Sequence, residues 1–281
     1  MTGARLGTLR VPGGTVAVRV DGHEAVETGH PDVGALLADP AWRDVVRAAD
    51  GPRHALAALT PTAWAPPVPR PSKIVCVGLN YRAHILEMGR DLPAHPTLFA
   101  KFGEALVGPY DPIALPAHAA DAVDWEGELA VVVGTRARRL DVPAAAEAIA
   151  GYAVLNDVTM REHQYRTPQW LQGKTFEATT PFGPWLTLAE PGRPLRGELR
   201  TAVDGEEVQR ADVADLVFGP AELVSYVSWI VTLQPGDVIA TGTPGGVGHA
   251  RRPPRYLRPG QVLTTEVAGL GGLRNDVVAE G

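Results

Sequence analysis

The segment DAVDWEGELAVVVG, residues 121–134, constrains the fold of this chain more than any other. Its second half, from Leu129 onward, is an apolar run typical of a strand that is buried on both faces. Its first half places Asp124, Glu126 and Glu128 at every second position, and side chains at this spacing point to the same face of a strand. Like charges on one face repel, and burying them unpaired is costly. If these carboxylates are buried, they therefore need a partner.

A hard divalent cation is one such partner, because it replaces repulsion between carboxylates with a shared attraction. Glu126 and Glu128 can hold one ion from the same face, and Asp157, which follows the apolar run of GYAVLND, can supply a third carboxylate. Three carboxylates without His or Cys favour Mg²⁺, Mn²⁺ or Ca²⁺ over zinc. The alternative is a solvated strand end whose acids bind nothing, and the spacing alone leaves both interpretations open.

A second cluster lies in NYRAHILEMG, where a helix would put His84 and Glu87 at positions i and i+3 on one face. A glutamate beside a histidine raises the basicity of the imidazole and fixes its tautomer, which suits a general base. The alternative is an ordinary surface pair on a helix, which contributes only a few tenths of a kcal/mol.

Two further segments carry candidate binding groups. Lys174, in QGKTF, can hold a substrate carboxylate or an oxyanion, although a lone lysine is usually only solvated. Thr243 lies in the glycine-rich segment ATGTPGGVG, whose amides can form an anion-binding nest. A tight turn without a ligand needs the same glycines.

Composition excludes several classes of partner. The net charge of −6 and the absence of a basic stripe argue against nucleic acid. The single cysteine, Cys76, excludes an intrachain disulfide and fits a reducing compartment. No apolar run reaches the roughly 18 residues of a membrane span, and no apolar signal segment begins the chain. We therefore expect a soluble, cytoplasmic protein with no membrane partner.

Several catalytic classes lack their motifs. None of the three serines lies in a G-x-S-x-G elbow, and GTPGGVG is not followed by the Lys-Ser/Thr of a P-loop. No G-x-G-x-x-G fingerprint is present. Cys76 lies between valines with no flanking charge to activate it, so we interpret it as a core residue.

The proline-rich segment 60–73 is typical of a stiff connector between two parts of the chain. We expect a small accessory domain over residues 1–65 and a larger domain over residues 66–281. The first part is predicted to contain a hairpin that turns at Gly13-Gly14 and one or two short helices.

The larger part is predicted to be strand-dominated with a few helices, and it lacks a regular βαβ alternation. A strand is expected over residues 72–80, and Asp204-Gly205 predicts a hairpin turn. Asp141 is expected to cap one of the helices. The expected helices cover residues 81–89, 141–152 and 220–233.

Five motifs in a fixed order resemble the fumarylacetoacetate hydrolase family. They are KIVCVGLNYRAHILEMG, DWEGELAVVVG, GYAVLNDVTMREHQ, QGKTF and PGDVIATGTPGGVG. The resemblance runs from about Ser72 to the C-terminus, and residues 1–65 resemble the small N-terminal α/β domain of many bacterial members. It implies an α+β fold with a mixed β-roll catalytic domain, and it implies a homodimer.

The resemblance also implies a Mg²⁺ or Mn²⁺ ion held by Glu126, Glu128 and Asp157, with Asp124 as a neighbour and not a ligand. The further residues that it implies are His84 and Glu87 as a water-activating pair on a lid helix, Lys174 as an oxyanion-binding group, and Arg161, Gln164 and Thr243 as substrate-binding groups. One departure is visible, because relatives often have Asp-Trp where this chain has Glu162-His163.

The implied activity is hydrolysis of a C–C bond in a β-dicarbonyl acid, such as an acylpyruvate, through a metal-stabilised enolate. The same enolate chemistry allows an isomerase or decarboxylase of 2-oxo diacids, of the oxaloacetate or 2-hydroxyhepta-2,4-diene-1,7-dioate type. A non-catalytic metal-binding protein that keeps the fold is the alternative from another class. The sequence does not choose among these reactions.

Overall fold

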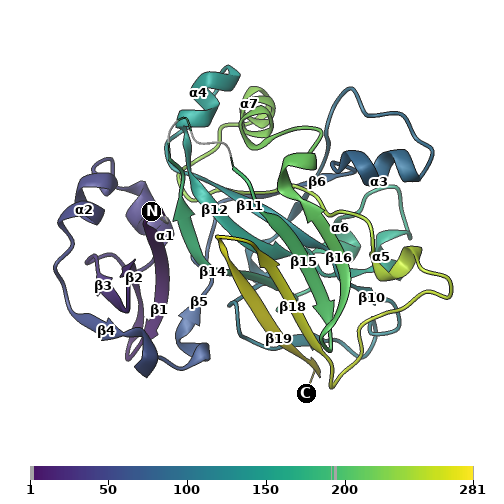
Figure 1. Ribbon diagram of the computed structural model, residues 1–281, viewed down its shortest axis with the longest axis horizontal. Coiled ribbons are helices and arrows are strands. Elements are labelled where there is room, and N and C mark those ends of the chain that lie inside the picture. The colour runs from purple at the N-terminus through teal and green to yellow at the C-terminus, as the bar shows by residue number, and fades with distance from the viewer. Residues whose placement is uncertain (1–2, 191, 193–194, 281) are drawn as a thin grey trace.

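The computed structural model of the chain describes residues 3–190, 192 and 195–280, and strands dominate it (Figure 1). A large sheet, a five-stranded sheet and a two-stranded ribbon make up the fold. The helices of the described residues are short, and the longest, α7 (Pro220–Ile230), has 11 residues. This is the strand-dominated α+β architecture that the sequence predicts.

The large sheet has 12 strands and a central path of ten. Along that path the order is β4 (Arg53–Ala55), β3 (Glu24–Glu27), β2 (Gly14–Asp21), β1 (Arg5–Val11), β14 (Thr180–Leu188), β12 (Ile149–Asn156), β11 (Gly127–Val133), β17 (Val238–Ala240), β6 (Ile74–Gly78) and β7 (Thr97–Lys101). Two short strands join it from the side, β5 (Trp64–Ala65) on β1 and β8 (Leu106–Val107) on β14.

A second sheet faces the middle of the first. Its order is β16 (Glu206–Asp212), β15 (Glu198–Val203), β18 (Val262–Val267), β19 (Gly271–Ala279) and β9 (Ile113–Leu115). Leu129 and Val154 of the large sheet pack with Leu199, Val267 and Leu273 of this sheet in one buried cluster. Both faces of β11 are therefore covered, as its apolar run predicts.

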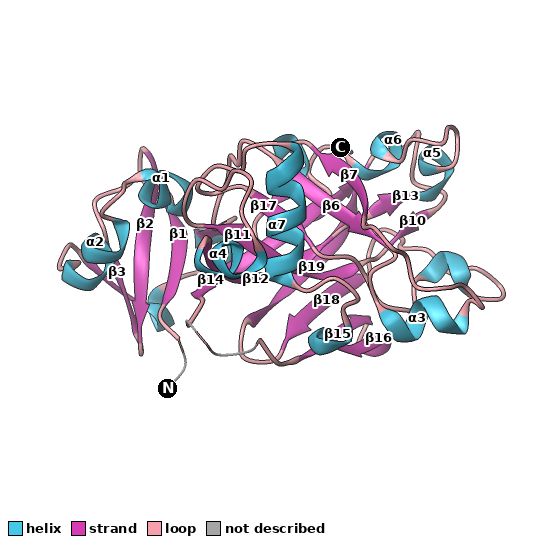
Figure 2. Cartoon of the chain, turned by 90° about the horizontal axis from the view of Figure 1, so that it is seen from above, coloured by secondary structure: helices cyan, strands magenta, loops and turns pink. Residues whose placement is uncertain are grey.

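Two helices cover the other face of the central strands. α4 (Val142–Glu147) and α7 lie side by side over the large sheet (Figure 2). Ala145 and Leu223 from these helices share a buried cluster with Val131 and Ile239 from the sheet. No helix of the described residues is both long and apolar enough to cross a membrane.

The first 65 residues contribute strands to the large sheet. Strand β1 is antiparallel to β14, with Leu6 opposite Leu186, and both leucines lie in the main buried cluster. The helices α1 (Val33–Ala38) and α2 (Trp42–Ala48) add Leu36 and Trp42 to the same cluster. The two parts of the chain thus share a sheet and a core, while their ability to fold separately stays a prediction.

Several predicted elements are present. Cys76 is fully buried in β6, and the hairpin β1–β2 is present, although its two turn residues are Pro12 and Gly13, one position before the predicted Gly13-Gly14. Asp204 and Gly205 join β15 to β16 with φ angles of 53° and 82°, as a two-residue hairpin turn requires.

One helix prediction is wrong at its C-terminal end. Asp141 does cap α4 by accepting from the Ala144 amide at 2.9 Å. The helix ends at Glu147, however, and not at Tyr152, because Ile149–Asn156 forms β12 between β11 and β14. Pairing with two strands outweighs the helix propensity of an alanine-rich segment. The helix predicted over 220–233 likewise ends earlier, at Ile230.

Three short helices lie at the end of the molecule opposite α1 and α2 (Figures 1 and 2). They are α3 (Arg82–Glu87), α5 (Arg161–Gln164) and α6 (Leu171–Lys174). The ribbon of β10 (Val123–Asp124) and β13 (Thr159–Met160) lies at the same end. Elsewhere along the chain, the 3-10 helices of the described residues are η1 (Leu56–Ala58), η2 (Pro61–Ala63), η3 (Gly103–Ala105), η4 (Val213–Asp215) and η5 (Gly248–Ala250).

Candidate active site

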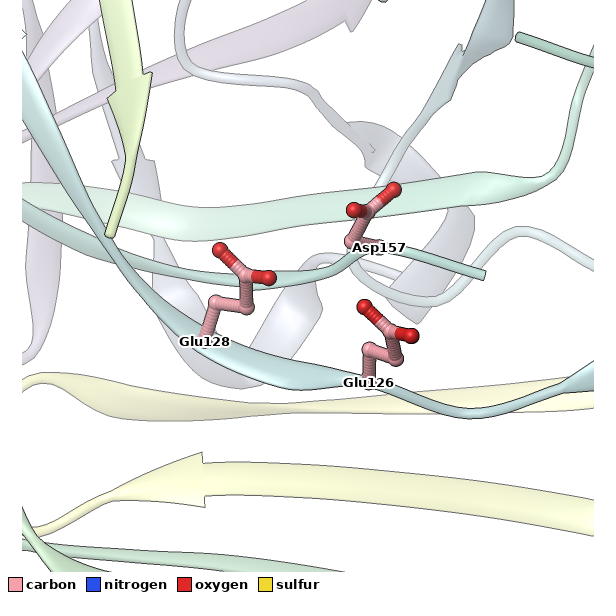
Figure 3. A group of neighbouring side chains, drawn as sticks. All are labelled: Glu126, Glu128 and Asp157. Carbon is pink, nitrogen blue, oxygen red and sulfur yellow. The ribbon is translucent and has the colours of Figure 1, made fainter. Parts of the chain in front are cut away.

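Three carboxylates converge where β11 begins and β12 ends (Figure 3). The antiparallel register sets Glu128 opposite Leu155, and the Asp157 amide donates to the Glu126 carbonyl oxygen at 2.8 Å. Carboxylate oxygens of Glu126, Glu128 and Asp157 all lie within 4.8 Å of one another, and all three residues are buried. The structure therefore brings together the three acids that the sequence singles out.

Three buried cations surround this cluster. Lys174 Nζ donates to Glu126 Oε2 at 2.6 Å and to Asp157 Oδ2 at 2.8 Å. Lys101 Nζ donates to Asp157 Oδ1 at 2.5 Å, and Arg161 Nη2 lies 2.7 Å from Glu126 Oε1. Two of the three carboxylates are thus held by cations.

Glu128 is the exception. One of its oxygens accepts from the Gly242 amide at 2.7 Å, and no ion pair to it is present among the described residues. Burial and the carboxylates of Asp157 and Glu126 raise the pKa of Glu128 well above its ordinary range. A positive charge at this point would reverse that effect.

The donor set fits a hard divalent cation. The buried cluster of Asp124, Glu126, Glu128 and Asp157 faces Lys101, Arg161 and Lys174, which leaves a formal excess of one negative charge. Oxygen donors without His or Cys suit Mg²⁺ or Mn²⁺. Glu126, Glu128 and Asp157 are the residues that would hold the ion.

Asp124 makes contacts that differ from those of the three clustered acids. Its carboxylate accepts from the amides of Gly248 and His249 at 2.7 and 2.8 Å and from Arg161 Nε at 2.9 Å. It therefore joins the loop that carries η5 to α5. Arg161 also donates to Gln164 Oε1 at 2.8 Å, so these two predicted substrate-binding residues are oriented by each other.

A cavity of about 330 Å³ opens beside the acids. It is lined by six of the residues singled out from the sequence: His84, Glu126, Arg161, Gln164, Lys174 and Thr243. Glu87 is exposed and does not line it. The cavity also takes in His249 and Arg90, which the motifs did not identify.

His84 projects into this cavity from α3 and packs over the glycine-rich loop, since a methyl group built on Gly245 would lie 3.1 Å from His84 Nδ1. Burial lowers the pKa of His84 below its ordinary value of 6.5, and the carboxylates of Glu87 and Glu126 offset only part of this effect. The imidazole is therefore neutral at pH 7 and can accept a proton. No hydrogen bond joins His84 to Glu87 in the described part of the chain.

Lys174 is held in its charged form. Burial lowers its pKa, but Asp157 and Glu126 outweigh burial and raise the pKa above its ordinary value. The side chain is thus a fixed positive charge at the wall of the cavity.

Thr243 lines the cavity, but its hydroxyl is already engaged. It donates to the Gly127 carbonyl oxygen at 3.0 Å and accepts from Gln209 Nε2 at 2.8 Å. These contacts tie the glycine-rich loop to the start of β11. A substrate carboxylate at Thr243 would have to share these hydrogen bonds.

Lys101 was not identified by the motifs, and the Glu162-His163 pair departs from the family pattern. Lys101 is the one buried residue of β7, and a lysine that follows a short apolar run is the only sequence signal that could have identified it. His163 is buried against Phe176, with ring centroids 4.9 Å apart, and it does not line the cavity. The departure from the family pattern therefore changes packing behind α5 and not the cavity wall.

The strand-dominated fold thus places a buried Glu-Glu-Asp cluster, which could hold a divalent metal ion, beside a cavity lined by His84 and Lys174. Residues 73–278 match the family described as Fumarylacetoacetate (FAA) hydrolase C-terminal. The chain belongs to this fumarylacetoacetate hydrolase family, and it is an enzyme.

Relatives within the family carry out different reactions. The chain is 42% identical over 237 residues to oxaloacetate tautomerase Fahd2a, mitochondrial, of Rattus norvegicus, a match that covers 80% of this chain and 74% of the relative. It superposes on 5-carboxymethyl-2-hydroxymuconate delta-isomerase from Mycobacterium smegmatis with a TM-score of 0.80 at 35% identity, covering 98% of this chain and 100% of that one. Fumarylacetoacetate hydrolase from Exiguobacterium antarcticum gives a TM-score of 0.86 at 31% identity, with 99% and 100% covered.

Proposed function

We propose that this enzyme is a Mg²⁺- or Mn²⁺-dependent isomerase that interconverts the keto and enol forms of a 2-oxo acid, with oxaloacetate as the first substrate to test. The observation that carries the proposal is that His84, whose pKa burial lowers, lines the same cavity as Glu126 of the carboxylate cluster. The relative with 42% identity is an oxaloacetate tautomerase, which supports the same reaction.

In the proposed reaction, the metal ion and the side chains of the protein have different roles. A divalent cation held by the three carboxylates would act as a Lewis acid on the 2-oxo group and acidify the neighbouring C–H bond. His84 takes the proton from carbon 3, and a proton returns to the 2-oxo oxygen. One C–H bond breaks and one O–H bond forms, so no co-reactant is needed.

The remaining cavity residues position and stabilise the substrate. Lys174 supplies a fixed positive charge for the oxygen that becomes negative during proton removal. Arg161 and Gln164, which are joined by a 2.8 Å hydrogen bond, form the wall against which the 2-oxo acid lies. These groups are in place before substrate binds, so little reorganisation is needed.

Hydrolysis of an acylpyruvate is the second candidate, because His84 and Glu87 share one face of α3 at the spacing of a water-activating pair. Two features favour isomerisation over it. Glu87 is exposed outside the cavity, and its carboxylate makes no hydrogen bond to His84 in the described chain. Decarboxylation of a 2-oxo diacid uses the same enolate, and an experiment can distinguish it from isomerisation by the products formed.

The test is nuclear magnetic resonance in D₂O with Mg²⁺ present, with oxaloacetate and acetylpyruvate as separate substrates. The proposal predicts fast deuterium exchange at carbon 3 of oxaloacetate, without net loss of substrate, and slow or no cleavage of acetylpyruvate. Release of acetate from acetylpyruvate at an enzymatic rate would favour the hydrolase, and pyruvate from oxaloacetate would favour the decarboxylase. Tight metal binding without any turnover would favour a non-catalytic protein.

Assembly as a homodimer, which the family resemblance implies, stays a proposal. Light scattering coupled to size-exclusion chromatography tests it directly, with a mass near twice 29.8 kDa as the expected result.

A further inference from the structure

The rim of the cavity carries an arginine, Arg90, that the proposed chemistry does not yet use. We propose that Arg90 binds the distal carboxylate of the substrate and so makes the enzyme selective for 2-oxo dicarboxylic acids over 2-oxo monocarboxylic acids. This inference rests on the proposed function, because it names the substrate class of that same site.

The other cavity-lining cations are already paired. Lys174 donates to Glu126 and Asp157, and Arg161 donates to Asp124 and Gln164 and lies 2.7 Å from Glu126. Within the described residues, Arg90 is the one lysine or arginine of the cavity lining whose side chain has no ion pair or hydrogen bond. Arg90 is therefore the cation that can bind a second carboxylate of the substrate.

Local backbone geometry sets Arg90 beside the proposed base. Gly89 has a φ angle of 67°, which favours glycine, and it ends α3 by turning the chain back toward the helix. The Arg90 amide then donates to the Ile85 carbonyl oxygen at 3.2 Å. His84 and Arg90 are therefore carried by one short unit, and the charge of Arg90 is close enough to lower the pKa of His84.

Substrate chemistry requires this proximity. In a four-carbon 2-oxo diacid, carbon 3 lies between the 2-oxo carbon and the distal carboxylate. Carbon 3, from which the base removes the proton, is therefore bonded directly to that carboxylate. Since His84 and Arg90 both line the cavity and are carried by α3 and the turn that ends it, a guanidinium–carboxylate contact would hold carbon 3 against the imidazole. Arginine suits this role because its planar fork binds a carboxylate through two parallel hydrogen bonds.

The test compares Arg90→Gln with the matched control Arg82→Gln. Arg82 is an exposed arginine at the start of the same helix and does not line the cavity. Deuterium exchange at carbon 3 is measured for oxaloacetate and for 2-oxobutanoate, which has a methyl group where oxaloacetate has the distal carboxylate.

We expect Arg90→Gln to lower kcat/KM for oxaloacetate by about 10- to 100-fold, as the loss of a charge-assisted bidentate contact does. The same variant should keep kcat/KM for 2-oxobutanoate within about 2-fold of the unmodified value. Arg90→Lys should recover part of the loss on oxaloacetate, because a point charge remains. Arg82→Gln should match the unmodified protein with both substrates. Equal losses on both substrates, or no loss on oxaloacetate, would overturn the inference.

Calorimetric binding separates this inference from the proposed function. If the unmodified protein exchanges neither substrate, isomerisation fails as the activity. Binding of oxaloacetate to the Mg²⁺-loaded protein would then still decide the role of Arg90. Weaker binding of oxaloacetate by Arg90→Gln, with unchanged binding of 2-oxobutanoate, supports the inference, and unchanged oxaloacetate binding overturns it.

Discussion

Lys101 Nζ lies 2.5 Å from Asp157 Oδ1, and both side chains are fully buried. The contact joins β7, at one end of the large sheet, to the turn that follows β12. Burial raises the pKa of Asp157, but Lys101 and Lys174 outweigh burial, so that this pKa lies below its ordinary value. Asp157 is therefore ionised and fixed in place before any cation binds.

Replacing Lys101 by methionine should destabilise the protein. Removal of one partner of a buried ion pair typically costs about 3–5 kcal/mol of unfolding free energy. Urea unfolding of the metal-free protein measures the effect. Arg47→Gln is the control, because the ion pair of Arg47 with Asp44 is exposed and should contribute little. A Lys101→Met variant as stable as the control would contradict this description of the cluster.

Replacing Glu128 by glutamine should weaken metal binding with little change in shape. Glu128 is the carboxylate without an ion pair, so its charge is the one that a cation would neutralise. We expect Mn²⁺ to bind at least about 10- to 100-fold more weakly, the loss that even a supporting contact causes at metal sites. Calorimetric titration with Mn²⁺ tests this prediction. The control is Glu162→Gln, which replaces an exposed glutamate. Equal affinities for both variants would remove Glu128 from the ligand set.

The pH dependence of exchange should report the protonation of His84. Because burial lowers the pKa of His84, the neutral base form persists below pH 6.5. The rate constant kcat/KM for oxaloacetate should therefore fall with decreasing pH through an apparent pKa below 6.5. His84→Gln should lower the rate by about 10²- to 10⁴-fold and abolish this limb. An acidic limb that survives in His84→Gln would assign the base to another group.

Glu87→Gln separates the two candidate reactions. A water-activating pair needs both members, whereas proton removal by His84 alone does not. We expect Glu87→Gln to keep carbon 3 exchange within about 10-fold of the unmodified rate, since Glu87 is exposed and outside the cavity. A loss as large as that of His84→Gln would return the hydrolytic pair to the mechanism.

A chain shortened to residues 66–281 tests the proposed accessory domain. Removal of residues 1–65 would leave β14 without its partner β1, and it would take Leu6, Leu36 and Trp42 out of the main buried cluster. We expect the shortened chain to lose cooperative thermal unfolding, as measured by calorimetry. Cooperative unfolding with full metal binding would show instead that the larger part folds alone.

The clustering of Glu126, Glu128 and Asp157 can be predicted from the sequence because part of its signal is local. Alternating carboxylates at the entrance to an apolar strand have few structural solutions, and the antiparallel register of β11 and β12 brings Asp157 to them. The same locality explains the hairpin at Asp204-Gly205. The turn residues themselves adopt the backbone angles that it requires.

What the sequence does not predict depends on contacts between distant segments. Lys101 reaches Asp157 only because β7 and β12 belong to one sheet, and nothing in the segment TLFAK indicates that partner. Arg90 and His249 line the cavity because loops fold over it. The error over residues 141–152 has the same origin, since pairing partners on both sides turn Ile149–Asn156 into a strand.

The measurement that tests the central claim most directly follows the decay of the enol absorbance of oxaloacetate in the ultraviolet. It compares metal-stripped protein, the same protein with Mg²⁺ or Mn²⁺ restored, and a Glu126→Ala variant with the same additions. We predict fast enol–keto conversion that requires the restored ion and is lost in Glu126→Ala. Conversion that is as fast in the stripped protein or in Glu126→Ala would contradict the claim that the buried carboxylates hold the ion on which the reaction depends.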